Sequence, residues 1–462
     1  MTYRHTNDIA PFCVLASLSS CVLFASLVSA DDWPQWLGPE RDGVWRESGI
    51  IEEFPPHGPP VRWRTPIGGG FAGPAVVADR VYVTDRKVGE RERDPAKPFE
   101  RGTVPGTERI LCLDATDGSV IWKHEYDCTY TVSYPSGPRT TPLVSAGKVY
   151  TLGAEGHLFC FDAATGKVIW FRELKKDYQI QSPVWGFSAS PLLDGHCLIC
   201  VVGGPESVAV AFHKDSGKEI WRALSAIEPG YSPPMIYEAG GKRQLIIWHP
   251  EAVNSLDPQT GKVYWTEPFE VRAGLTIASP RKSGNLLFVT SFYGGPMMLR
   301  FDDSQATAKL LWKGNSNSER KTDKLHSIMS TPFIQDGFIY GVCSYGQLRC
   351  ITTDSGERIW ESLEATGATG NTRSNIDRWA NAFLIKNGDR FFLANEKGDL
   401  IIAKLTPEGY QQLSQTHLLK PTNSMPGRDV VWSHPAFANR QAYMRNDEEI
   451  ICVELAANPA SE

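Results

Sequence analysis

The sequence has little charge and no excess of basic residues. Charged residues make up 22% of its 462 residues, with 47 Lys and Arg against 53 Asp and Glu, and the formal net charge at pH 7 is -6. Proteins that bind nucleic-acid backbones or anionic membrane surfaces usually carry a basic field. We therefore expect no nucleic-acid partner.

Several short motifs that carry chemistry are also missing. The chain has no pair of adjacent cysteines, no C-x-x-C-H haem-attachment motif and no G-x-S-x-G motif. The glycine run Gly68–Gly70 is not followed by a predicted helix, so it does not indicate a dinucleotide-binding site. Neither a lipase-like hydrolase nor a dinucleotide-dependent enzyme is predicted.

The first 30 residues differ from the rest of the chain. Arg4 precedes an apolar run of small residues over 11–28, and a small-x-small site ends at Ala30. This pattern predicts a signal peptide cleaved near Ala30, an extracytoplasmic protein, periplasmic or secreted, and no transmembrane span after processing. Two alternatives stay open: an uncleaved anchor, and a lipid anchor on Cys21, because residues 18–21 resemble a lipoprotein processing box.

The remaining cysteines do not suggest disulfide bonds or a metal site. Four of them occupy the same place in successive repeats, namely Cys112, Cys160, Cys350 and Cys452. Equivalent positions in different repeats are too far apart to bridge, so we expect buried core residues. Cys197 and Cys200 fall within an apolar strand, where residues three apart point to opposite faces and cannot share one ion. We predict no metal site.

What the sequence does contain is a repeat. The chain has 41 Gly, 32 Pro and 11% aromatic residues, which favours many short strands separated by turns. The segment Asp162–Trp170 recurs with variation at Asp114–Trp122, His213–Trp221, Asp257–Trp265 and Thr352–Trp360. In each copy a Gly stands four residues before a Trp, which predicts a hairpin turn followed by an edge strand whose Trp packs between repeats. The predicted structural tryptophans are Trp63, Trp122, Trp170, Trp221, Trp265, Trp312 and Trp360.

Each repeat reads as four short antiparallel strands over about 40 to 50 residues, the period of a propeller blade. The chain holds eight such units, but the last one ends without its Trp strand. The strand around Trp63 supplies the missing piece, so we predict an all-β, eight-bladed propeller whose ring is closed by this N-terminal strand. The predicted organisation is a signal peptide (1–30), an N-terminal extension (31–59), one propeller domain (60–457) and a tail (458–462).

The repeats and the opening segment Trp33–Pro39 resemble the pyrroloquinoline-quinone-like (PQQ-like) propeller proteins of bacteria. The resemblance spans about Trp33 to Leu455. It implies the fold but not one activity, because the family contains quinoprotein dehydrogenases, a lipoprotein of outer-membrane assembly and members of unknown role.

Loop lengths distinguish the two faces of the predicted ring. Turns between the first and second and between the third and fourth strands are short, whereas long segments join the second strand to the third and one blade to the next. We call the face with these long segments the long-loop face, and we expect binding there. The residues just before innermost strands should surround the channel mouth on this face: Arg139, Trp185, Ser188, Tyr231, His326, Trp379, Asn381, Trp432 and His434.

Two interpretations of these residues follow. The aromatic side chains could simply fill the channel, or they could stack on a planar quinone whose carboxylates meet Arg139 and a histidine. A resemblance to quinoprotein alcohol dehydrogenases would further imply a pair of adjacent cysteines, which this sequence lacks. It would also imply carboxylate and amide ligands for Ca²⁺, for which Asp377 and Asn381 are the only nearby candidates.

We therefore predict a non-catalytic binding or assembly scaffold, monomeric and without cofactor, for an envelope protein, peptide or glycan. The alternative is a PQQ- and Ca²⁺-dependent dehydrogenase acting on an alcohol or sugar.

Overall fold

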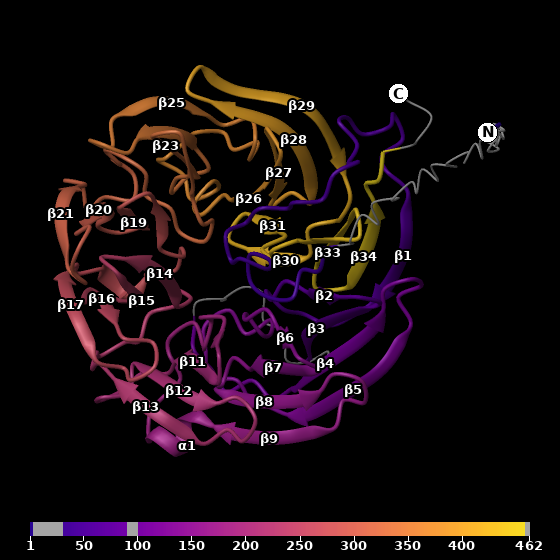
Figure 1. Cartoon of the computed structure of the whole chain (residues 1–462), viewed down its shortest axis with the longest axis horizontal. Helices are drawn as coiled ribbons and strands as arrows, with labels where there is room; N and C mark the ends of the chain where they lie inside the picture. The colour runs from indigo at the N-terminus through magenta and orange to yellow at the C-terminus, as the bar shows by residue number, and fades with distance from the viewer. Residues whose placement is uncertain (3–30, 90–99, 458–462) are drawn as a thin grey trace.

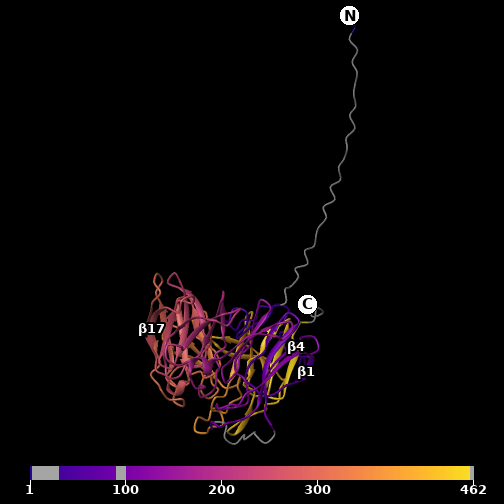
Figure 2. The same ribbon diagram turned by 90° about the horizontal axis from the view of Figure 1, so that it is seen from below.

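Eight four-stranded antiparallel sheets surround a central channel in the computed structural model, which describes residues 1–2, 31–89 and 100–457 (Figure 1). The predicted signal peptide, the Cys21 lipid site and the tail from residue 458 lie outside the described residues. Seen edge-on, the sheets form a thick disc (Figure 2). The prediction of an eight-bladed all-β propeller is confirmed.

In each blade the first strand is innermost and the fourth is at the rim. The first four blades consist of β2 (Ala75–Val77), β3 (Arg80–Lys87), β4 (Thr107–Asp114) and β5 (Val120–Asp127); β6 (Leu143–Ser145), β7 (Lys148–Leu152), β8 (His157–Asp162) and β9 (Val168–Glu173); β10 (Leu192–Asp194), β11 (Cys197–Val201), β12 (Ala209–His213) and β13 (Glu219–Ala223); β14 (Met235–Ala239), β15 (Lys242–His249), β16 (Ala252–Leu256) and β17 (Val263–Pro268).

The next three blades consist of β18 (Arg281–Ser283), β19 (Leu286–Ser291), β20 (Gly295–Phe301) and β21 (Ala308–Lys313); β22 (Phe333–Gln335), β23 (Phe338–Val342), β24 (Leu348–Thr352) and β25 (Arg358–Ser362); β26 (Ala382–Asn387), β27 (Arg390–Asn395), β28 (Asp399–Thr406) and β29 (Gly409–His417). The eighth is made from both ends of the chain, with β32 (Ala436–Ala438), β33 (Gln441–Arg445), β34 (Glu449–Glu454) and β1 (Val61–Pro66). Strand β1 pairs with β34, as predicted, and closes the ring.

The Gly-x-x-x-Trp repeat joins neighbouring blades. Gly166 has a φ of +70°, and a Cβ added there would lie 2.5 Å from the ring of Trp122 in the preceding blade. The Trp122 indole donates a 3.0 Å hydrogen bond to the Ala163 carbonyl beside that turn. Trp63 meets Gly118 and Ala115 in the same way, so the closing strand is docked on the first blade. The glycine is needed because a side chain would displace the tryptophan that locks the blades.

The four cysteines at equivalent repeat positions, Cys112, Cys160, Cys350 and Cys452, are buried as predicted, and so are the other four that the structure describes. Cys197 packs with Ile199 in one core cluster, whereas Cys200 packs with Leu198 in another, so the two thiols point to opposite faces of β11. A shared metal site for Cys197 and Cys200 is excluded by this geometry.

Two long connecting segments have strand residues of their own. At the ends of the segment 86–109, residues 86–87 and 107–109 belong to β3 and β4, and Arg86, Glu108 and Arg109 are buried. Arg109 pairs with buried Asp85, so the charges at these ends form internal contacts instead of facing water. The segment 420–430 contains a hairpin, β30 (Asn423–Met425) and β31 (Arg428–Val430).

Among the described residues, helical structure is confined to short connections between blades. The segment after β9 contains the helix α1 (Leu174–Tyr178), and the segment after β17 contains a 3₁₀ turn, η1 (Arg272–Gly274). Within the described part of the chain, no helix is long and apolar enough to cross a membrane.

Candidate functional site

The N-terminal segment 33–46 crosses the central channel. At one end, Trp33 exchanges two backbone hydrogen bonds with Val76 of β2, at 2.8 and 2.9 Å. At the other end, the Trp45 amide donates to the Lys386 carbonyl of β26 at 2.7 Å. The segment therefore connects the first blade to the seventh and blocks the channel away from the long-loop face.

Arg41 fixes the middle of this crossing segment. Its guanidinium is buried and donates to the backbone carbonyls of Ser190, Pro191 and Pro234, at 3.0 to 3.3 Å. Burial lowers the pKa of Arg41 to about 10, so the side chain stays charged at neutral pH. From the fifth blade, Arg281 donates at 2.6 Å to the carbonyl of Asp42. These contacts hold the segment against the inner ends of three blades.

Above this segment, on the long-loop side, the channel contains a cavity of about 210 Å³. Trp36 forms its floor, with its indole nitrogen 3.0 Å from the Ser279 hydroxyl and its ring 4.4 Å from that of His434. The lining residues are Trp36, Phe71, Tyr134, Arg139, Trp185, Ser188, Ser190, Tyr231, Pro233, Leu275, Ile277, Ile328, Met329, Trp379, Phe383, Trp432 and His434. Aromatic and aliphatic side chains thus form most of its wall.

The structure brings most of the predicted channel-mouth residues together around this cavity. Those that line it are Arg139, Trp185, Ser188, Tyr231, Trp379, Trp432 and His434. His326 and Asn381 do not line it and are buried beside it. The His326 side chain contacts the fifth blade and the segment that follows it. Its Nε2 lies 3.0 Å from Asp323, and its Nδ1 lies 3.4 Å from the carbonyl oxygen of Phe292.

Other wall residues were not predicted. Trp36, Phe71, Tyr134 and Phe383 line the cavity as well. Trp36 belongs to the segment Trp33–Pro39, which carries the family resemblance. The presence of a tryptophan outside the repeats was the only feature of the sequence that could have indicated its place in the cavity wall. Tyr134 lies in a connecting segment and has a left-handed backbone with φ +54°, which nothing in the sequence pattern indicates.

The β30–β31 hairpin lies toward the centre of the ring in Figure 1 and packs on the cavity wall. Met425 and Val430 of this hairpin cluster with Tyr134. Buried Glu396 anchors the hairpin, accepting a 2.7 Å hydrogen bond from Arg428 and a 3.0 Å bond from the Trp432 indole. One carboxylate therefore orients a wall tryptophan and ties down the hairpin.

Two ionisable side chains determine the charge of the cavity. The Arg139 guanidinium lies 5.2 Å from the centre of the Phe71 ring and donates to the backbone carbonyls of Gly137, Ser133 and Tyr134. Burial lowers the pKa of Arg139 below its usual range. Burial also lowers the pKa of His434 to about 3, so this imidazole is neutral at physiological pH.

The cavity does not fit pyrroloquinoline quinone with Ca²⁺. Among the described residues that line it, none carries a carboxylate or a side-chain amide, the oxygen donors that calcium requires. Asp377 is buried elsewhere, where its Oδ2 accepts the Thr369 amide at 2.9 Å, and Asn381 does not reach the cavity. Arg139 already donates to three carbonyls, and His434 is neutral, so few groups remain to bind the carboxylates of a quinone.

Solved structures similar to this chain include a BamB protein and quinohemoprotein alcohol dehydrogenases. BamB from Moraxella catarrhalis is 15% identical, covering 86% of this chain and 98% of its own, with a TM-score of 0.53. The quinohemoprotein alcohol dehydrogenase from Comamonas testosteroni is 13% identical, covering 93% and 81%, with a TM-score of 0.57. At these identities the likeness shows the fold alone.

Comparison with protein families identifies the family of this chain, which the similar structures alone do not. No curated protein matches the sequence significantly. The family model described as outer membrane protein assembly factor BamB, a PQQ-like repeat model, matches residues 106–232 and 205–457. These two matches together cover most of the eight blades. The chain therefore belongs to the PQQ-like β-propeller repeat family that this model represents.

Proposed function

We propose that this propeller is a non-catalytic binding scaffold that receives an apolar or aromatic group of an envelope protein or peptide in its central cavity. The observation that carries the proposal is the cavity itself, open toward the long loops and walled by Trp36, Trp185, Trp379 and Trp432. Half-buried indoles give large contact area at small entropic cost, which is typical of binding surfaces. Arg139 adds a positive charge to this wall, although its guanidinium hydrogen bonds go to the backbone carbonyls of the wall itself.

Export is part of the same proposal. The composition of residues 1–30 is that of a signal peptide. The family description refers to outer membrane protein assembly, which supports a role in the cell envelope with a protein partner. A glycan is the competing ligand class, because indole rings also stack on the faces of sugars.

Titration with PQQ and Ca²⁺ tests the scaffold against the quinoprotein alternative. We expect calorimetry on the purified mature protein to show no saturable binding, because the described wall lacks calcium ligands. Saturable binding near one equivalent per chain, lost in Trp185→Ala, would overturn the proposal.

Site-specific photo-crosslinking in the native host tests the binding face directly. A photoreactive residue at Ile376, in the segment that leads to Trp379, should capture a defined partner. The matched control is Ile169 on the rim strand β9, since the two side chains are 45% and 43% exposed. The adduct at Ile376 should weaken in Trp185→Ala. Equal adducts at both positions, or no adduct at either, would contradict binding at this face.

A further inference from the structure

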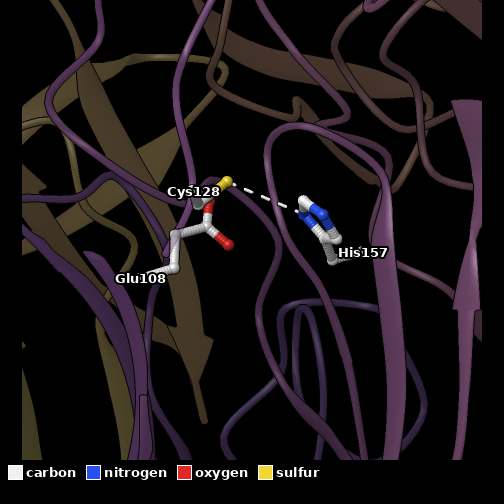
Figure 3. Close-up of side chains that lie close together, drawn as sticks. All are labelled: Glu108, Cys128 and His157. Atoms are coloured by element: carbon white, nitrogen blue, oxygen red, sulfur yellow. Dashed lines mark hydrogen bonds between the residues drawn. The ribbon is translucent and has the colours of Figure 1, made fainter. Parts of the chain in front are cut away.

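Three potential metal ligands converge between the first and second blades, on the long-loop side. Glu108 lies at the start of β4, Cys128 directly follows β5, and His157 begins β8 (Figure 3). One ligand atom from each lies within 4.8 Å of the other two, and Cys128 Sγ is 3.6 Å from His157 Nδ1. Glu108 and Cys128 are buried, and His157 is partly buried.

The Glu108 carboxylate is oriented toward this point with one acceptor position left. Its Oε1 accepts the Tyr130 hydroxyl and the Ala154 amide, the latter at 3.1 Å. Its Oε2 accepts the Tyr126 hydroxyl. Each carboxylate oxygen has two acceptor positions, so Oε2 keeps one. Within the described residues, Glu108 forms no ion pair, and Arg139 acts on it without direct contact. A bound cation would add the direct compensation that favours burial of a carboxylate.

The surroundings also fix the imidazole. The His157 ring stacks nearly parallel to Phe171, with 6.1 Å between centroids and 11° between planes. The Tyr126 ring meets it edge-on at 5.1 Å. Tyr126 therefore contacts both the carboxylate and the imidazole, as residues around bound metals do when they orient the ligands.

We propose that Glu108, Cys128 and His157 bind a zinc-type transition-metal ion. One oxygen, one thiolate sulfur and one imidazole nitrogen match the ligands that Zn²⁺ takes, with the fourth tetrahedral position left for water. The soft sulfur and the imidazole disfavour Mg²⁺ and Ca²⁺. On binding, the Cys128 thiol loses its proton to the solvent and the metal–sulfur bond replaces the S–H bond.

The ion would connect the first blade to the second, next to the segment that leads to the cavity wall. Cys128 packs in a small cluster with Tyr130, Val132 and Ala154, and the same segment continues to Tyr134 in the cavity wall. A metal held by β4, β8 and this segment would tie the first blade to the second and stabilise the backbone that delivers Tyr134. This site stands independently of the binding function proposed above.

Cobalt titration of metal-free, reduced protein is the test, because Co²⁺ substitutes for Zn²⁺ and absorbs strongly when bound by a thiolate. We expect the thiolate band to saturate near one equivalent and to disappear when Zn²⁺ is added. Cys128→Ser should abolish the band, and His157→Gln should weaken binding at least tenfold. Tyr126→Phe should weaken it by about 10- to 100-fold, the usual effect of losing a residue that orients a ligand.

Cys160→Ser provides the matched control, because Cys160 is a buried thiol in β8 of the same blade as His157. This variant should keep the band and the affinity. Circular dichroism establishes that each variant is folded. A native protein that shows no thiolate band at millimolar Co²⁺, or a band that survives in Cys128→Ser, would overturn the proposal.

Discussion

The central cavity and the Glu108–Cys128–His157 cluster lie toward the same face of the ring but differ in what they can bind. The cavity has about 210 Å³ of space, four indoles in its wall and no carboxylate among its described lining residues. The cluster places a carboxylate, a thiol and an imidazole within 4.8 Å of one another. The channel, where a cofactor would be sought first, is therefore the poorer site for ion chemistry.

This difference follows from how each region is built. Most of the cavity wall comes from residues shortly before or at the start of innermost strands, and each blade contributes at least one of them. The crossing segment adds Trp36. The cluster comes from one junction, where β3 and β4 have eight residues each and bury the charged side chains of Asp85, Arg86, Glu108 and Arg109. Such strands bring Glu108 beside the second blade.

The largest effect should come from removing the anchor of the cavity wall. Glu396→Ala leaves Arg428 and the Trp432 indole without their buried acceptor. Breaking a buried charge pair in this way costs about 3 to 5 kcal/mol of unfolding free energy. Urea denaturation measures that loss.

The control for this variant lies in the same blade. Asp389→Ala removes an exposed ion pair with Lys404. The Asp389 side chain is 77% exposed and that of Lys404 is 42% exposed. It should cost about 0 to 1 kcal/mol. Similar losses for the two variants would mean that Glu396 does not act as an anchor.

The next largest effect is stabilisation by Zn²⁺, which should depend on the Glu108–Cys128–His157 cluster and not on the cavity. At a free Zn²⁺ concentration 100 times the dissociation constant, the unfolding free energy should rise by about 2.7 kcal/mol, because the ion binds the folded state only. Cys128→Ser should not respond to Zn²⁺, whereas Trp36→Ala, at the cavity floor, should respond like the parent. Thermal unfolding with and without zinc measures both. Stabilisation by Ca²⁺ of equal size would contradict the assignment to soft ligands.

The sequence was a good guide to the fold and to part of the cavity. The Gly-x-x-x-Trp period predicted the blades, and six of the seven predicted Trp side chains donate to a turn of the next blade, whereas Trp265 donates to Gln244 of its own blade. The missing last strand predicted closure by the strand around Trp63. The floor formed by Trp36 was not predicted, because the crossing segment has no repeat and its path depends on contacts such as those of Arg41.

The cluster was hidden for a different reason. Glu108, Cys128 and His157 form no short motif, and Cys128 and His157 are 29 positions apart in the chain. Only pairing of neighbouring blades brings them together. His326 is a residue that the sequence placed at the channel mouth, because it precedes an innermost strand. In the structure its side chain points to Asp323 and does not line the cavity. Strand order can be predicted from a repeat, whereas side-chain direction in a connecting segment depends on packing.

The smallest of these effects tests the neutrality of the cavity. The His434 ring is buried between Trp36 and Phe383, and burial lowers its pKa to about 3. In the unfolded chain the imidazole has a pKa near 6.5, so below that pH the unfolded state binds a proton that the folded state does not. Folding is therefore less favourable as pH falls from about 6.5 toward 3, and between pH 7 and pH 5 this histidine should remove about 2 kcal/mol of stability.

His434→Phe isolates this contribution, because phenylalanine keeps an aromatic ring beside Trp36 but takes up no proton. Other buried histidines with lowered pKa values, such as His249 and His326, are present in both proteins, so their effects cancel in the difference. Unfolding free energies of the two proteins at pH 5, 6 and 7 should diverge as the pH falls, with the variant losing less. If both lose stability in parallel, His434 is hydrated enough to ionise in the folded protein. The cavity would then carry a second positive charge beside Arg139 and would favour an acidic partner over the apolar one proposed here.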